Sequence, residues 1–357
     1  MITLSKKYVK TNKYYYVVVA IAIYAIIFGM RYGVGADFFG YLHEFESMVK
    51  YGEPLTKTEP GYELLERIAA FTGSSTFYFA LVAFLQLFFV VLGFKEKKYI
   101  YPTLFFTFVF MATWLNYGNG LRQVLASCIW TFSIKYIIER KPIIHYLLVA
   151  IAVTLHYSAW VLIIFYPIIR LSSNWFKKPI IEIALVILSL IVGNINVIQE
   201  VIQQSETLIV LLGYDNYLTT YDEMLESEVT LGAGFIIGLL INLIVIFYSE
   251  KVKKFVNSDY YNILYSLYVV GVIIGYAFLG SQMISRINWY FNICSFGIVA
   301  FTLYYFKSSK QKVPFVALGS LILLKFVAII YKAAVNTALF VFNWQDQFFA
   351  LKKFMDI

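Results

Sequence analysis

Apolar runs of roughly membrane-spanning length recur along almost the whole of this chain, with short clusters of lysine and arginine between them. Of its 357 residues, 61% are hydrophobic and only 14% are charged. A single soluble core cannot bury so much apolar surface, so the sequence predicts an all-α, polytopic integral membrane protein. The net charge of +8 does not indicate a nucleic-acid partner, because the cations stand between apolar runs and not along basic faces.

The positions of the basic clusters indicate how the chain crosses the membrane. Lysine and arginine are enriched in cytoplasmic loops, and here their clusters follow alternate apolar runs. This pattern predicts about eleven crossings with a cytoplasmic amino terminus, in a single membrane domain over the whole chain, 1–357. Residues 31–75 and 197–230 are then outer-face loops, whose mixed polarity favours short helices lying at the membrane interface.

The apolar stretch 143–170 departs from the simple alternation. As one straight helix it would be roughly 42 Å long, well over the thickness of a bilayer core. Counted as one span, it would also place Arg170, Lys177 and Lys178 on the outer side, against the rule for basic residues. Two arms hinged near His156 restore the alternation, so the sequence predicts a broken or re-entrant helix pair there. His156 would then lie at the floor of a water-filled dip in the outer face.

Residues 116–123, with the sequence Asn-Tyr-Gly-Asn-Gly-Leu-Arg-Gln, put a permanent cation where two apolar runs meet. The asparagines and glycines end one helix, and Arg122 falls in the first turn of the next. A guanidinium beside hydrocarbon is costly unless it meets an anion, a partner or water. Free N–H groups and the positive end of the helix dipole join Arg122 in favouring a phosphate-like anion. The alternative is an arginine that snorkels to lipid headgroups.

Two further arginines, Arg31 and Arg286, fall at the outer ends of other spans in this topology. Pyrophosphate suits bidentate donors, so three arginines in one leaflet favour a site for a pyrophosphate headgroup. For each arginine alone, snorkelling or a structural ion pair remains an alternative. No metal site is indicated, because Cys128 and Cys294 lie in apolar runs and match no metal-ligand spacing.

A histidine and several residues near the outer face are further candidates. His156 could act as a base, since histidine is the side chain that most often serves as a general base, although a lone histidine in an apolar segment is more often structural. Asp37 follows a glycine turn among aromatic residues, a mixture that could hold a sugar. Glu59 begins a helix and can serve simply as an N-terminal cap. Trp289 and Tyr290 could line a sugar site, although interfacial aromatic belts explain most such residues.

Five short motifs follow one another between residues 31 and 291. They are Arg31-x-Gly33-Val34-Gly35-x-Asp37-x-x-x-Tyr41, Glu59-Pro60-Gly61-Tyr62, Leu121-Arg122-Gln123-x-x-Ala126, His156-x-Ser158-Ala159, and Arg286 before Tyr290-Phe291. Their order and spacing resemble the EpsG-like family of Wzy-type bacterial polymerases of O-antigen, exopolysaccharide or capsule. The chain departs from the pattern at Ala36, where threonine or serine is expected, and at Gly120, where the family often has a bulkier residue.

The resemblance implies a GT-C-like glycosyltransferase of the bacterial cytoplasmic membrane. Such an enzyme moves a growing glycan from undecaprenyl pyrophosphate to the sugar of a lipid-linked repeat unit on the outer face, with inversion and without metal or other cofactor. The implied partners are this lipid-linked oligosaccharide, the bilayer, a chain-length regulator and a flippase. The implied site has pyrophosphate bound by Arg31, Arg122 and Arg286, a base at His156 or Asp37, a catalytic charge at Arg122, and substrate contacts from Tyr41, Glu59, Gln123, Ser158 and Tyr290.

Three other functions remain open from the sequence. A ligase or acyltransferase for surface glycans would use the same lipid-linked donor with a different acceptor. A transporter or flippase would carry charged groups along a path through the membrane, and only Lys325 lies in the middle of an apolar run. A structural scaffold of a biosynthetic complex would tolerate lysine in place of its arginines.

Overall fold

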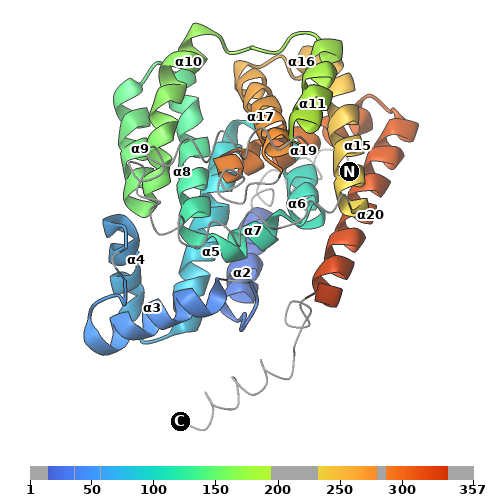
Figure 1. Ribbon diagram of the computed structural model, residues 1–357. Coiled ribbons are helices and arrows are strands. Elements are labelled where there is room, and N and C mark those ends of the chain that lie inside the picture. Colours follow the sequence, from blue (N-terminus) through green and yellow to red (C-terminus); the bar gives the residue numbers. More distant parts are fainter. Residues whose placement is uncertain (1–14, 36, 57, 194–231, 280–286, 337–357) are drawn as a thin grey trace, which may run out of the picture.

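The structure, a computed structural model, describes residues 15–35, 37–56, 58–193, 232–279 and 287–336 (Figure 1). These residues form helices and their connections, and no strand occurs among them. The predicted outer-face loop 197–230 and Arg286 lie outside the described residues. In chain order the helices are α2 (Tyr15–Gly29), α3 (Phe38–Tyr51), α4 (Pro60–Ala70), α5 (Ser75–Gly93), η1 (Lys95–Ile100), α6 (Tyr101–Phe110), α7 (Thr113–Asn119), α8 (Leu121–Ile138), α9 (Pro142–Leu155), η2 (Tyr157–Ile164), α10 (Phe165–Leu171), α11 (Pro179–Gly193), α15 (Ala233–Phe247), α16 (Ser249–Val256), α17 (Asp259–Ala277), η4 (Asn288–Phe291), α19 (Asn292–Ser308) and α20 (Lys312–Asn336).

Several of these helices are long and apolar enough to cross a bilayer. Within the described ranges there are four, namely α5, α17, η4 with α19, and α20 over Lys312–Tyr331. The pair α15 and α16, bent by 54°, makes a fifth if it forms one span. Apolar helices of 10–17 residues are α2, α9, η2 with α10, and α11. The all-helical, apolar architecture predicted from the sequence is therefore present, while the count of about eleven crossings stays a prediction.

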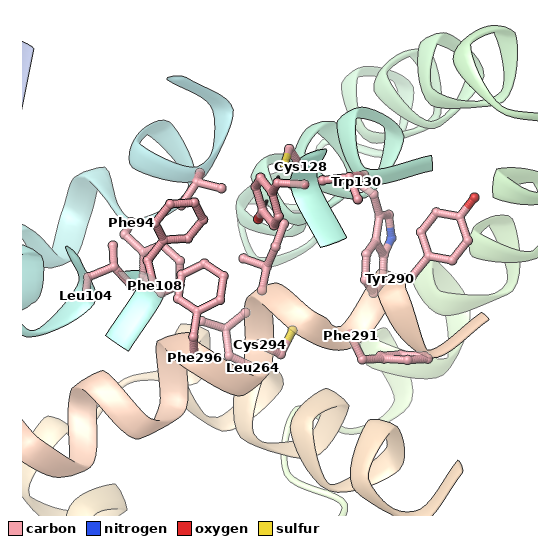
Figure 2. Close-up of a cluster of buried hydrophobic side chains, with 14 of the residues drawn as sticks. Phe94, Leu104, Phe108, Cys128, Trp130, Leu264, Tyr290, Phe291, Cys294 and Phe296 are labelled. Atoms are coloured by element: carbon pink, nitrogen blue, oxygen red, sulfur yellow. Dashed lines mark hydrogen bonds between the residues drawn. The ribbon is translucent and has the colours of Figure 1, made fainter. Parts of the chain in front are cut away.

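The core holds α8 at the centre of the molecule. Aromatic side chains from neighbouring helices interdigitate there, as Figure 2 shows for Phe108 of α6 and Phe296 of α19, whose ring centroids are 5.6 Å apart. Cys128 of α8 and Cys294 of α19 are both buried free thiols in this core. Because α8 buries side chains on all sides, its first turn is held in a fixed position.

The helix after residue 142 breaks at His156, as the sequence predicts. His156 has φ −159° and ψ 117°, an extended conformation that ends α9 and starts η2 in a new direction. The two arms lie side by side, and both pack against α8 (Figure 1). The break therefore carries His156 at the tip of a hairpin of two short apolar arms.

The segment between α2 and α5 contains two helices, α3 and α4, neither of which is long enough to span a bilayer. The connection between them is held by Glu44 of α3, whose carboxylate accepts hydrogen bonds from the backbone N–H groups of Leu55 and Thr56. The α3–α4 segment lies at the same end of the molecule as α7 and the tip between α9 and η2 (Figure 1).

Candidate functional site

A cavity of about 410 Å³ lies where the α3–α4 segment meets the first turn of α8 and the break at His156. Five separate parts of the chain contribute to it, which is the arrangement expected of a ligand site between helices. Its lining consists of Asp37, Gly40, Tyr41, Glu44, Thr56, Thr58, Tyr62, Glu66, Gly120, Arg122, Gln123, His156 and Trp289.

Glu59 connects two sides of this cavity. As the residue before Pro60 it is extended, with φ −68° and ψ 138°, and its side chain does not cap α4. One carboxylate oxygen lies 2.7 Å from the guanidinium of Arg122. The other accepts hydrogen bonds from His156 Nδ1 at 2.9 Å and from the backbone N–H of Tyr157 at 3.2 Å. The Glu59 side chain therefore does not cap α4, as one interpretation of the sequence had it. It forms an ion pair with Arg122 and caps the first turn of η2.

A close helix contact makes this geometry possible. A Cβ at Gly61 would lie 2.3 Å from Thr154 Oγ1, so only glycine lets α4 approach α9 to this distance. The approach brings Glu59, two residues earlier, to His156, one residue after the end of α9. The absence of a side chain at Gly61 thus allows two residues that are 97 positions apart in the sequence to form a hydrogen bond.

Arg122 presents its cation to the cavity. It is the second residue of α8, and its side chain remains 33% exposed while that of Glu59 is 6% exposed. Its guanidinium carbon lies 6.0 Å from the ring centroid of Tyr41 and 5.9 Å from that of Tyr62, within cation–π range. The ion pair and the two rings fix the position of a charge that solvent or a ligand can still reach.

The start of α8 is also closed on one side by an aromatic ring. A Cβ at Gly120 would lie 2.0 Å from a carbon of the Trp289 ring, so the small residue is required here. This contact accounts for the glycine at position 120 of this chain. It brings the indole of η4 to the cavity wall beside Arg122, where sugars commonly meet aromatic faces.

Charge and hydrogen bonding keep Glu59 ionised. Burial alone raises the pKa of its carboxyl, but the hydrogen bond from His156 and the charge of Arg122 outweigh it and lower the pKa to about 2. When His156 Nδ1–H donates to this carboxylate, Nε2 carries the lone pair of the ring. The pair Glu59 and His156 therefore has the arrangement of an oriented base, with His156 lining the cavity.

Asp37 and Tyr41 also line the cavity. The backbone N–H of Asp37 donates to Asn119 Oδ1 at 2.9 Å, which docks the turn before α3 onto α7. Gly35 in this turn has φ +103°, a conformation that a residue with a side chain rarely adopts. The docked turn places α3 so that Asp37 and Tyr41 face the space in front of Arg122.

Arg31 does not reach this cavity. It is 7% exposed, donates a hydrogen bond to the backbone carbonyl of Gly118, and its guanidinium carbon lies 4.8 to 5.5 Å from the ring centroids of Phe28, Phe38 and Phe79. The expectation that Arg31 shares a wet hollow with Arg122 is corrected. Three aromatic faces hold this cation behind the wall, where it secures α7.

Two predicted substrate contacts bind each other and do not line the cavity. Ser158 Oγ and the hydroxyl of Tyr290 are 2.8 Å apart, and Tyr290 is fully buried. Their bond ties η4 to the first turn of η2. Gln123, the third residue of α8, does line the cavity. Arg286 lies outside the described residues, so its predicted role stays a prediction.

Sequence reasoning missed the acidic residue that the cavity shares with α4. Glu66 lines the cavity, is 1% exposed, and accepts a hydrogen bond from the hydroxyl of Tyr78 at 3.1 Å. Burial, opposed by this hydrogen bond and reinforced by the charge of Glu44, raises the pKa of Glu66 to about 7. The available signal was helical spacing, because Tyr62, Glu66 and Ala69 fall on the one buried face of α4.

No group of three or more histidine, cysteine, aspartate or glutamate side chains within the described ranges could hold a metal ion. The groups that line the cavity are suited instead to an anion beside Arg122 and to hydroxyl-bearing ligands beside the carboxylates and tyrosines. An anionic head with an attached sugar has both features.

A comparison with protein families identifies the family of the chain. The model of the EpsG family matches residues 14–345, nearly the whole chain. The chain belongs to the EpsG family. Membership of this family, together with the apolar helices, indicates a membrane-embedded, polysaccharide-related protein. No curated protein and no solved structure matches the chain.

Proposed function

We propose that this EpsG-family protein is a polysaccharide polymerase. In the proposed reaction it transfers the growing glycan from undecaprenyl pyrophosphate to a sugar hydroxyl of a lipid-linked repeat unit. The observation that carries the proposal is Arg122, a fixed guanidinium paired with Glu59 that still faces a cavity lined on its other side by carboxyl and tyrosine side chains. This combination suits a ligand with a pyrophosphate at one end and a sugar at the other.

The proposed chemistry is a single displacement at the anomeric carbon. The bond from that carbon to the phosphate oxygen breaks, and a bond to the acceptor hydroxyl oxygen forms on the opposite face, so the configuration inverts. The hydroxyl proton passes to His156 Nε2, while Arg122 stabilises the negative charge that develops on the departing pyrophosphate. Glu59 orients His156 and Arg122 together. Asp37 is the second candidate base, because it lines the same cavity.

The proposal includes the predicted topology. The protein would have a GT-C-like arrangement in the bacterial cytoplasmic membrane, with its amino terminus in the cytoplasm and the cavity open to the outer face. The half-length arms on either side of His156 support this, since a break at such depth is tolerated where it lines a water-filled hollow. A chain-length regulator and a flippase are its proposed partners, and neither a metal nor another cofactor is required.

The direct test uses purified protein in nanodiscs and the lipid-linked repeat unit of the producing strain. Products are sized by gel electrophoresis and mass spectrometry. The proposal predicts lipid-linked multimers of increasing length. Transfer of single repeats to another acceptor would indicate a ligase, and movement of labelled lipid across proteoliposomes without a new bond would indicate a flippase. Either result would overturn the polymerase proposal.

A further inference from the structure

Two buried polar atoms on the α4 side of the cavity have no hydrogen-bond partner. They are Oε2 of Glu66 and Oγ1 of Thr58, whose residues are 1% and 8% exposed. Both residues line the cavity that contains Arg122. A buried carboxyl oxygen and a buried hydroxyl are costly to leave without partners, so a ligand that supplies hydrogen-bonding groups would stabilise this wall.

The Glu66 side chain is held in place by a chain of hydroxyl groups. Tyr62 and Tyr78 have their hydroxyl oxygens 2.6 Å apart, and Tyr78 donates to Glu66 Oε1, so Tyr62 donates to Tyr78. All three side chains are buried. The carboxyl is thus fixed through one oxygen while the other oxygen is left for a ligand, which is the geometry of a preorganised acceptor.

A neighbouring carboxylate shows the contrast. Glu44 also lines the cavity, but its oxygens already accept hydrogen bonds from Leu55 N–H, Thr56 N–H and Thr56 Oγ1. Its role is to fold the connection between α3 and α4. In the described structure Glu66 Oε2 accepts no hydrogen bond from the backbone. The hydrogen-bonding capacity that is left on this wall therefore belongs to Glu66 Oε2 and Thr58 Oγ1.

We propose that Glu66 and Thr58 form a sugar subsite that hydrogen-bonds the hydroxyl groups of the acceptor sugar, in the same cavity as the pyrophosphate. The inference rests on the proposed function. The cavity also contains the carboxyl groups of Asp37 and Glu44, which repel an anion and so favour binding of the pyrophosphate at Arg122. Hydroxyl groups of a sugar satisfy both the free carboxyl oxygen and the free threonine oxygen.

The protonation of Glu66 is compatible with this role. Because burial raises its pKa to about 7, the carboxyl can accept a hydrogen bond from one sugar hydroxyl or donate one to another near neutral pH. The ring of Tyr41, which lines the same cavity and has its centroid 6.0 Å from the guanidinium carbon of Arg122, offers a face for stacking of the same sugar.

Two probes separate the inference from the function on which it rests. The first is inorganic pyrophosphate, and the second is the repeat-unit oligosaccharide released from its lipid by mild acid. Each is titrated calorimetrically into full-length protein in nanodiscs. The test variants are Glu66→Gln, which replaces the free oxygen by an amide, and Thr58→Val, which removes the hydroxyl with little change in shape. The control is Glu63→Gln, three residues earlier on α4, where the carboxylate pairs with Arg67 at the surface.

We expect each test variant to weaken binding of the oligosaccharide by about tenfold and to leave binding of pyrophosphate within about twofold of wild type. Glu63→Gln should bind both probes normally. Unfolding temperatures establish that each variant is folded. If Glu66→Gln does not fold, Thr58→Val alone tests the proposal.

Unchanged oligosaccharide affinity in the folded variants would overturn the sugar subsite, as would wild-type protein that binds pyrophosphate but not the oligosaccharide. Wild-type protein that binds oligosaccharide through Glu66 but shows no pyrophosphate binding sensitive to Arg122→Ala would instead overturn the proposed polymerase site. The two failures are therefore distinguishable.

Discussion

Two polar cavities lie at opposite ends of α8, and both contain arginine. The cavity at the first turn of α8 measures about 410 Å³ and contains Arg122. The cavity beyond the last turn of α8 measures about 580 Å³ and is lined by Arg140, Arg170 and Lys177. By volume and number of cations, the second would be the better site for an anion.

The surroundings of the cations reverse that ranking. Arg122 lies at the positive end of a helix dipole, is fixed by Glu59, and faces two tyrosine rings. Arg140, Arg170 and Lys177 are exposed; Arg140 follows the end of α8 and Arg170 lies in the last turn of α10, where the dipole disfavours anions. The difference teaches that positioned charge indicates chemistry, while loose charge at helix ends indicates membrane topology.

The largest expected effect is on the rate of polymer formation, and it is tested with one arginine substitution in each of the two cavities. Arg122→Ala should lower the rate of polymer formation by about 100- to 1000-fold, because it removes a charge that stabilises the leaving group. Arg170→Ala should leave the rate within about twofold of wild type. Rates are measured with purified proteins and lipid-linked repeat units. Equal losses in both variants would remove the distinction between the two ends.

The next effect concerns the acid stability of the ion pair. The folded pKa of Glu59 is lowered from 4.5 to about 2, so wild-type protein should lose about 2 kcal/mol of stability as the pH falls through this window. Above pH 4.5 that stabilisation is fully present. Glu59→Gln should lack it at every pH and so show a flatter profile. Thermal unfolding between pH 2.5 and 7 provides the measurement.

Asp259→Asn at the other cavity is the matched control for Glu59→Gln. Its carboxylate is exposed and receives one long hydrogen bond of 3.5 Å from Ser173, so the variant should keep the wild-type profile. A Glu59→Gln profile as steep as that of wild type would contradict the ion-pair account.

A smaller effect tests the helix contact that assembles the first cavity. Gly61→Ala places a methyl group against Thr154 and should push α4 away from α9, separating Glu59 from His156. We expect about tenfold lower activity with the protein still folded, because catalytic geometry is more sensitive than packing to such a shift. Gly319→Ala on α20, where a Cβ meets nothing within 4 Å, is the control. Full activity in Gly61→Ala would show that this contact does not set the geometry.

The smallest effect has the opposite sign from that at Glu59. The pKa of Glu66 is raised from 4.5 to about 7, so the folded protein holds a proton that the unfolded chain releases in this window. Its contribution therefore destabilises the fold as the pH rises from 4.5 to 7. Glu66→Gln should remove that cost and gain about 1 kcal/mol over wild type at pH 8. Chemical unfolding at pH 4.5 and pH 8 measures it, and a gain at both pH values would contradict the titration.

The sequence predicted those features that follow from chain chemistry over short distances. Hydropathy indicated apolar helices, basic clusters indicated the break at His156, and the glycine-asparagine segment placed Arg122 in the first turn of α8. The partnership of Glu59 with Arg122 and His156 could not be predicted, because it depends on two helices meeting at Gly61. Proximity across 63 and 97 residues is a property of packing and leaves no local pattern.

The environment of Arg31 could not be predicted from the sequence either. Its position at the outer end of α2 is equally compatible with a cavity or with a buried aromatic cage, and only the docking of α3 and α5 around it decides. Glu66 could have been found, since helical spacing puts it on the buried face of α4. The adjacent Arg67 does not pair with it, because Arg67 pairs with Glu63 at the surface.

The measurement that tests the central claim most directly is a cryo-electron microscopy structure of the protein in nanodiscs with undecaprenyl pyrophosphate bound. The account predicts the diphosphate within hydrogen-bonding distance of Arg122, at the first turn of α8, with the lipid chain leaving the cavity toward the bilayer. A diphosphate bound among Arg140, Arg170 and Lys177 at the other end of α8 would contradict it.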